Sequence, residues 1–220
     1  MALHQLLHRS RHHDAGWRRV RAAARSFTAL FFIIALVWAP AARVQAATTI
    51  TFTGAELLGR PTDSSIMITI VPASTIEYAY EYGTAPGTYT GETPLATAAA
   101  GQPGKVVIDG LDPNTRYYYR MKYHLPGETD WVTRTERSFW TQRERGSTFT
   151  FTITSDSHVN IMLGSGTNWT QTMNNIADDH PDFHLDLGDT FAMDNVTTVA
   201  AAESAYRLQY QYFNLVSHSA

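Results

Sequence analysis

The sequence predicts an all-β sandwich followed by the start of an α/β domain. Residues 48 to about 142 contain short runs rich in β-branched and aromatic residues, separated by turn clusters of Gly, Pro, Asn and Asp. From residue 148 the pattern changes to strand, helix and strand, the repeating unit of an open α/β sheet. The polar segment 141–147, which contains Gly146, is typical of a domain junction. We therefore expect one domain over 47–142 and the beginning of a second over 148–220.

Residues 1–46 are predicted to be a signal peptide. An arginine-rich leader precedes the apolar run 27–39, and Val44-Gln45-Ala46 places small residues where a signal peptidase cleaves. The apolar run is shorter than the roughly 20 residues that a helix needs to cross a bilayer. We expect an exported, periplasmic or extracellular protein without membrane attachment after cleavage, and an uncleaved N-terminal membrane anchor is the alternative.

Charge and cysteine content exclude several classes of function. Seven of the 17 basic residues but only one of the 20 acidic residues precede Ala47, so the remaining chain carries a formal charge of −9. Such a surface repels polyanions, and we expect no nucleic-acid binding. The chain has no cysteine, which removes disulfides and thiolate chemistry from consideration.

The first domain is predicted to contain strands over 66–71, 76–82, 105–108, 116–123 and 138–141, a spacing that favours a sandwich. Segment 111–117, Leu-Asp-Pro-Asn-Thr-Arg-Tyr, resembles the tyrosine corner of fibronectin type III domains, which implies a hydrogen bond between the Tyr117 hydroxyl and backbone upstream. Segment 82–87, Tyr-Gly-Thr-Ala-Pro-Gly, resembles a turn in the amino-terminal domain that precedes phosphoesterase domains of purple-acid-phosphatase type. The many tyrosines are interpreted as inward residues of the sandwich, with a ligand surface as the alternative.

The second domain is predicted to begin with a strand over 148–154, a helix starting near 164–167 and a strand over 183–187. Trp169, Met173 and Ile176 recur on one face of that helix, and Pro181 closes the segment. A right-handed crossover of this length sets the two strands parallel, with their carboxyl ends at the same edge. Open α/β sheets place their functional sites at that edge.

Candidate metal ligands follow both strands. Asp156 and His158 come directly after the first, and Asp189 follows the second, 33 positions after Asp156. Gly188 has no Cβ, which lets the backbone turn sharply before Asp189. Carboxylates and an imidazole at one edge can hold a pair of metal ions for phosphoryl transfer, and the alternative is that they are polar turn residues.

Asp156-Ser157-His158 and Gly188-Asp189 resemble the first two signatures of the calcineurin-like metallophosphoesterase superfamily. The resemblance implies a four-layer α/β domain that hydrolyses phosphate mono- or diesters with two ions of iron, zinc or manganese. It implies that Asp156 and His158 bind the first ion and that Asp189 bridges both.

The sequence departs from that family in two ways. Ala192 stands where the family often has Asp or Tyr, and His158 where purple acid phosphatases have glycine, so their ferric-tyrosinate centre is not expected. No Gly-Asn-His or Gly-His-x-His follows, although these supply the family's remaining ligands and its catalytic histidine. We therefore expect a C-terminally truncated fragment, inactive by itself, whose catalytic residues lie in a missing part. The alternative is a non-catalytic surface or adhesion protein with a degenerate phosphoesterase remnant.

Other residues near the site are interpreted as structural. Asp178, Asp179 and His180 are expected to end a helix, and His184 to lie inside a strand rather than at its tip. A last helix is predicted over 200–217, with Tyr206, Tyr210 and Phe213 packing on one side.

Overall fold

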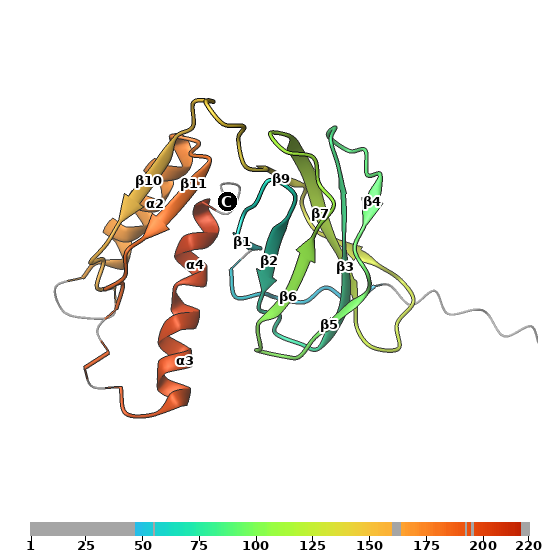
Figure 1. The fold of residues 1–220 in the computed structure, drawn as a ribbon. Helices are drawn as coiled ribbons and strands as arrows, with labels where there is room; N and C mark the ends of the chain where they lie inside the picture. Colours follow the sequence, from blue (N-terminus) through green and yellow to red (C-terminus); the bar gives the residue numbers. More distant parts are fainter. Residues whose placement is uncertain (1–46, 55, 160–163, 192, 195, 217–220) are drawn as a thin grey trace, which may run out of the picture. The chain divides into compact units, whose positions relative to one another are not determined.

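The computed structural model describes residues 47–54, 56–159, 164–191, 193–194 and 196–216 (Figure 1). The predicted signal peptide and Ala192 lie outside these residues. Among the described residues, none of the helices combines the length and apolar character that crossing a bilayer requires.

Two antiparallel sheets form the first part of the described chain. The smaller sheet has the order β1-β2-β6, and its strands are β1 (Leu57–Gly59), β2 (Ile66–Ile70) and β6 (Gly104–Ile108). In the larger sheet β3 (Ile76–Gly83) pairs with β7 (Arg116–His124) over seven residue pairs, from Glu77 opposite His124 to Gly83 opposite Tyr118. Four shorter strands extend it, namely β4 (Gly91–Glu92), β5 (Ala96–Ala98), β8 (Val132–Thr133) and β9 (Arg137–Trp140).

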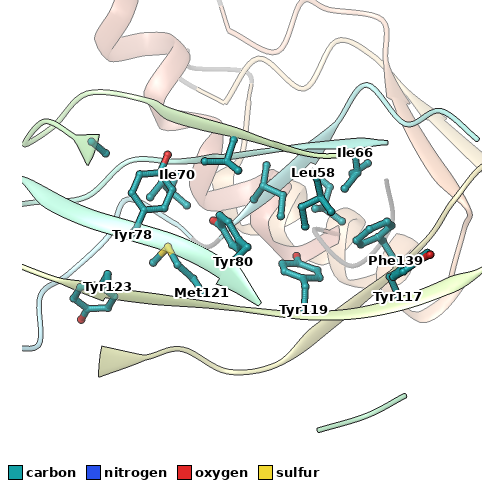
Figure 2. Close-up of a cluster of buried hydrophobic side chains, with 14 of the residues drawn as sticks. Leu58, Ile66, Ile70, Tyr78, Tyr80, Tyr117, Tyr119, Met121, Tyr123 and Phe139 are labelled. Atoms are coloured by element: carbon teal, nitrogen blue, oxygen red, sulfur yellow. The ribbon is translucent and has the colours of Figure 1, made fainter. Parts of the chain in front are cut away.

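One hydrophobic core joins these two sheets, which gives a sandwich-like β fold (Figure 2). Isoleucines of β2 alternate into it from one sheet, and tyrosines of β3 and β7 enter from the other. The rings of Tyr80 and Tyr119, for example, lie 6.0 Å apart and are tilted against each other. Five of the tyrosines interpreted as inward residues are buried, namely Tyr78, Tyr80, Tyr117, Tyr119 and Tyr123. Their rings therefore supply core volume rather than an exposed aromatic surface.

One hydrogen bond and a pair of ion pairs add polar contacts to the sandwich. The Asp112 amide donates to the Tyr117 hydroxyl at 3.0 Å, which is the hydrogen bond expected for a tyrosine corner. Glu56, only 2% exposed, forms ion pairs with Arg134 and Arg137, whose Nε atoms lie 3.1 and 3.3 Å from its carboxylate oxygens. A buried carboxylate requires such partners, because leaving it unpaired would cost several kcal/mol.

The strand, helix and strand of the second part form as predicted. Strands β10 (Phe151–Thr154) and β11 (Phe183–Asp186) are parallel, with Phe151 opposite Phe183 and Thr154 opposite Asp186. Helix α2 (Gly166–Asp178) connects them (Figure 1). The Ser165 side chain accepts a hydrogen bond from the Asn168 amide and caps the helix. The three apolar residues of its predicted face, Trp169, Met173 and Ile176, are buried.

Side chains alternate between the two faces of the β10–β11 sheet. Thr152, Thr154, His184 and Asp186 share one face, and the His184 ring lies 6.0 Å from that of Phe213. The opposite face is apolar, and we call it the aromatic face. It consists of the half-buried Phe183 and five exposed residues, Phe149, Phe151, Ile153, Leu185 and Leu187. Among the described residues β10 and β11 pair only with each other, so the four-layer arrangement remains an expectation.

The predicted helix over 200–217 is divided into α3 (Val199–Leu208), α4 (Tyr210–Phe213) and the 3₁₀ turn η1 (Asn214–Val216). The prediction that Tyr206 packs in a core was wrong, because α3 buries none of its residues and Tyr206 is 59% exposed. Its ring meets only the edge of Phe191 among described aromatic rings. Phe213 does pack as predicted, edge-on against Trp169.

Candidate metal centre

Two loops bring the predicted ligands together where β10 and β11 end. One ligand atom each from Asp156, His158 and Asp189 lies within 4.8 Å of the others. His158 Nε2 is 3.7 Å from Asp156 Oδ1, and the side chains of these residues are 32% and 63% exposed. The three side chains thus form an open group that solvent and a small ligand can reach.

Backbone hydrogen bonds continue the pairing of the two strands into these loops. The Asp156 amide donates to the Gly188 carbonyl at 3.0 Å, and the His158 amide donates to the Asp189 carbonyl at 3.3 Å. One step further, the Val159 amide donates to the Thr190 carbonyl at 3.0 Å. Each ligand loop therefore holds the other, and the relative positions of the three ligands are set by main-chain geometry.

All three candidate ligands have left-handed backbone conformations. Their φ angles are 57° for Asp156, 45° for His158 and 52° for Asp189, and only three other described non-glycine residues have positive φ. Such conformations cost of order 1–3 kcal/mol each and cluster at functional sites, because surrounding structure must hold them. Gly188 precedes Asp189 with φ +99°, a conformation that side chains with Cβ rarely adopt.

The donor set fits a divalent metal ion. Two carboxylates and one imidazole offer oxygen and nitrogen atoms, the mixture that zinc, manganese and iron bind. With both carboxyl groups ionised, the group is negatively charged whether or not His158 is protonated. His158 Nδ1 is buried without a hydrogen-bond partner among the described residues, so no described group occupies that nitrogen. A cation would offset the charge that two carboxylates bring together here.

The other polar residues near the site stay outside this group, as the sequence predicts. Asp178 ends α2, Asp179 is its C-cap, and His180 follows with φ 47°. His184 lies within β11, where Nδ1 is 2.9 Å from the Thr152 hydroxyl and Nε2 is 3.1 Å from the Thr154 hydroxyl. Both of its ring nitrogens are therefore occupied by neighbours on the adjacent strand.

Sequence reasoning missed one carboxylate beside the centre, that of Asp186. Its Oδ1 accepts a hydrogen bond from the Gly188 amide at 2.7 Å. Burial raises the pKa of Asp186, while the Gly188 amide, His184 and Thr154 act in the opposite direction. Burial also lowers the pKa of His184, with the Asp186 charge opposing it. The motif Asp-Leu-Gly-Asp at 186–189 was the available signal, because an aspartate two residues before a glycine often closes a turn.

No family model and no curated protein matches the sequence. Among solved structures, the fold is similar to that of PhoD, with a TM-score of 0.51 and 17% identity; the match covers 80% of this chain but 38% of PhoD. The sensor domain of the anti-sigma factor RsgI4 from Pseudobacteroides cellulosolvens matches with a TM-score of 0.34 and 13% identity, over 43% of this chain and 76% of that one. A redesigned β-sandwich protein gives 0.33 and 14%, over 46% and 98%.

Proposed function

We propose that this chain is part of an exported, metal-dependent phosphoesterase that hydrolyses phosphate mono- or diesters. The observation that carries the proposal is the group formed by Asp156, His158 and Asp189 at the carboxyl ends of two parallel strands. The fold similarity to PhoD supports a phosphoesterase-type function. The match spans 38% of the PhoD chain, so hydrolysis is proposed for the whole protein to which this region belongs.

In this proposal Asp156 and His158 hold one ion, and Asp189 is shared with a second. When bound, such ions lower the pKa of water and neutralise negative charge on the phosphoryl group. Iron, zinc and manganese all suit the donor set. The ladder of hydrogen bonds between the two loops keeps the ligands in place, so little ordering is required when metal binds.

Because the protein is negatively charged overall, we expect the metal ions rather than the protein surface to attract a phosphate substrate. The chain from Ala47 onward has a formal charge of −9, which repels a phosphate ester at long range. The centre itself is exposed, since the Asp156 side chain is 63% accessible. A phosphate oxygen can therefore approach the ligands directly, and affinity has to come from the bound cations.

The aromatic face supports the further proposal that additional polypeptide completes the α/β domain. Leu187 is 69% exposed, Ile153 52% and Phe149 51%, and the rings of Phe151 and Phe183 stack at 5.3 Å beside them. A contiguous apolar surface of this kind is normally covered, because its exposure to water is unfavourable. Further polypeptide on this face could also supply the remaining ligands and catalytic residues.

Hydrolysis of p-nitrophenyl phosphate and bis(p-nitrophenyl) phosphate by the whole protein tests the proposal and separates mono- from diesterase activity. We expect EDTA to abolish hydrolysis and Mn²⁺ or Zn²⁺ to restore it. Asp189→Asn should lower kcat/KM by about 100-fold or more, because it removes a ligand shared by both ions. The matched control Asp178→Asn removes an exposed carboxylate at the end of α2 and should leave activity unchanged.

Activity that persists in EDTA and in Asp189→Asn would contradict the metal-dependent reaction. A folded whole protein that hydrolyses neither ester and binds no metal would favour the non-catalytic surface or adhesion protein.

A further inference from the structure

The carboxylate of Asp186 closes the turn that carries Asp189. Asp186 is the last residue of β11, and its Oδ1 accepts a hydrogen bond from the amide of Gly188, two residues further on, at 2.7 Å. Aspartate side chains that bond to the backbone two residues ahead mimic a backbone turn and fix its direction. The backbone direction after β11 is therefore fixed by the Asp186 side chain as well as by pairing with β10.

The peptide groups that follow this turn hold both ligand loops. The Gly188 carbonyl accepts from the Asp156 amide at 3.0 Å, and the Asp189 carbonyl accepts from the His158 amide at 3.3 Å. Gly188 and Asp189 are consecutive residues with positive φ, +99° and +52°. Glycine adopts a positive φ without steric cost, whereas Asp189 is strained there unless its neighbours hold the conformation. Asp186 bonds to the Gly188 amide, which belongs to the peptide group immediately before the one that carries the Gly188 carbonyl.

Asp186 also lies beside the neighbouring strand. It lies opposite Thr154 in the parallel register, on the same face as His184. The Thr154 hydroxyl lies 3.1 Å from His184 Nε2, while the buried Oδ2 of Asp186 has no hydrogen-bond partner among the described residues. Asp186 is half-buried, whereas Asp189 is exposed. A partly buried carboxylate therefore lies three residues before an exposed one.

We propose that Asp186 is a positioning residue of the metal centre, whose carboxylate oxygen holds the Gly188 peptide in the orientation that presents Asp189 beside Asp156 and His158. The inference rests on the proposed function, because it takes these three residues to be metal ligands. Asp186 does not touch the ion in this proposal; it acts through the main chain.

In this role Asp186 needs to supply a hydrogen-bond acceptor and not a charge. The variants are therefore chosen to keep or to remove that acceptor. Asp186→Asn keeps an acceptor oxygen at the same place, so we expect Mn²⁺ affinity within about threefold of wild type. Asp186→Ala removes the acceptor, and we expect an affinity loss of about tenfold or more, as for other groups that orient metal ligands. Asp178→Ala removes an exposed carboxylate at the end of α2 and is the matched control.

The measurement is calorimetric titration of the full chain with Mn²⁺ alone, for wild type, these variants and Asp189→Asn. The proposal predicts that Asp186→Ala weakens binding while Asp186→Asn and Asp178→Ala do not. Equal affinities for Asp186→Ala and Asp178→Ala would overturn it, and so would an equal loss in Asp186→Asn and Asp186→Ala. Failure of wild type to bind Mn²⁺, or binding that Asp189→Asn leaves intact, would instead overturn the metal centre itself.

Hydrogen exchange provides a second readout that does not depend on Asp186→Ala folding well. The Gly188 amide should exchange slowly in wild type and in Asp186→Asn, because both keep its acceptor. Rapid exchange of the Gly188 amide in wild type or in Asp186→Asn would contradict the positioning role.

Discussion

Replacement of Asp189 by asparagine should change stability in opposite directions without and with metal. Ligand atoms of Asp156, His158 and Asp189 lie within 4.8 Å of one another, and both carboxylates are exposed. At that separation and a water-like dielectric constant, repulsion between two negative charges is about 1 kcal/mol. Without metal, Asp189→Asn should therefore be as stable as wild type or up to about 1 kcal/mol more stable, because the repulsion disappears.

With metal bound, wild type should instead be more stable than Asp189→Asn. An ion that binds only the folded chain stabilises it by about 2.7 kcal/mol at 100 times its Kd. Wild type should gain this amount, and Asp189→Asn should gain little because a charged ligand is lost. Urea unfolding followed by circular dichroism, once in EDTA and once in Mn²⁺, measures both free energies. Asp178→Asn, which alters an exposed carboxylate away from the group, should respond to Mn²⁺ as wild type does.

Two results would refute this reasoning. If Mn²⁺ stabilises Asp189→Asn as much as wild type, the ion is not held by Asp189. If Asp189→Asn is clearly less stable than wild type in EDTA, the carboxylate supports the fold and does not repel Asp156 in the metal-free chain.

Three further predictions concern the fold around the site. Tyr117→Phe should lower the free energy of unfolding by about 1 kcal/mol, because the Asp112 amide loses its acceptor, while Tyr118→Phe at a half-exposed position should have little effect in the same urea assay. Met173→Ala removes a fully buried side chain of α2 and should cost about 2–5 kcal/mol, seen as a lower unfolding midpoint. Burial lowers the pKa of His184, so the unfolded chain binds more protons below about pH 6.5; stability should fall from pH 7 to 5.5, and less steeply in His184→Gln.

Local patterns in the sequence predicted the elements that position the site. Threonines alternating with Phe151 and Ile153 indicated β10, and the spacing of Trp169 and Met173 indicated the buried face of α2. The predicted strand over 148–154 begins three residues late in the structure, where Phe151 lies opposite Phe183; before that point the Asp182 amide donates to the Thr150 carbonyl, but no strand pairing is formed. Strands of two or three residues, such as β4 and β8, are too short for alternation to be recognised.

Contacts between distant residues were not predictable in the same way. The sequence places Asp156 and Asp189 at the ends of adjacent strands, and their proximity follows from the parallel crossover. It does not show that Glu56 is buried beside Arg134, since those residues are far apart in the chain and only the folded sandwich joins them. The left-handed backbone of His158 likewise depends on hydrogen bonds that its own loop donates to carbonyls of the other loop.

A crystal structure of the whole protein grown with Mn²⁺ tests the central claim most directly, through the anomalous difference density of the ion. The account predicts a peak at about 2.0–2.3 Å from an oxygen of Asp156, a ring nitrogen of His158 and an oxygen of Asp189. A well-ordered site without a peak, or Mn²⁺ bound only elsewhere on the molecule, would contradict a metal centre at these three residues.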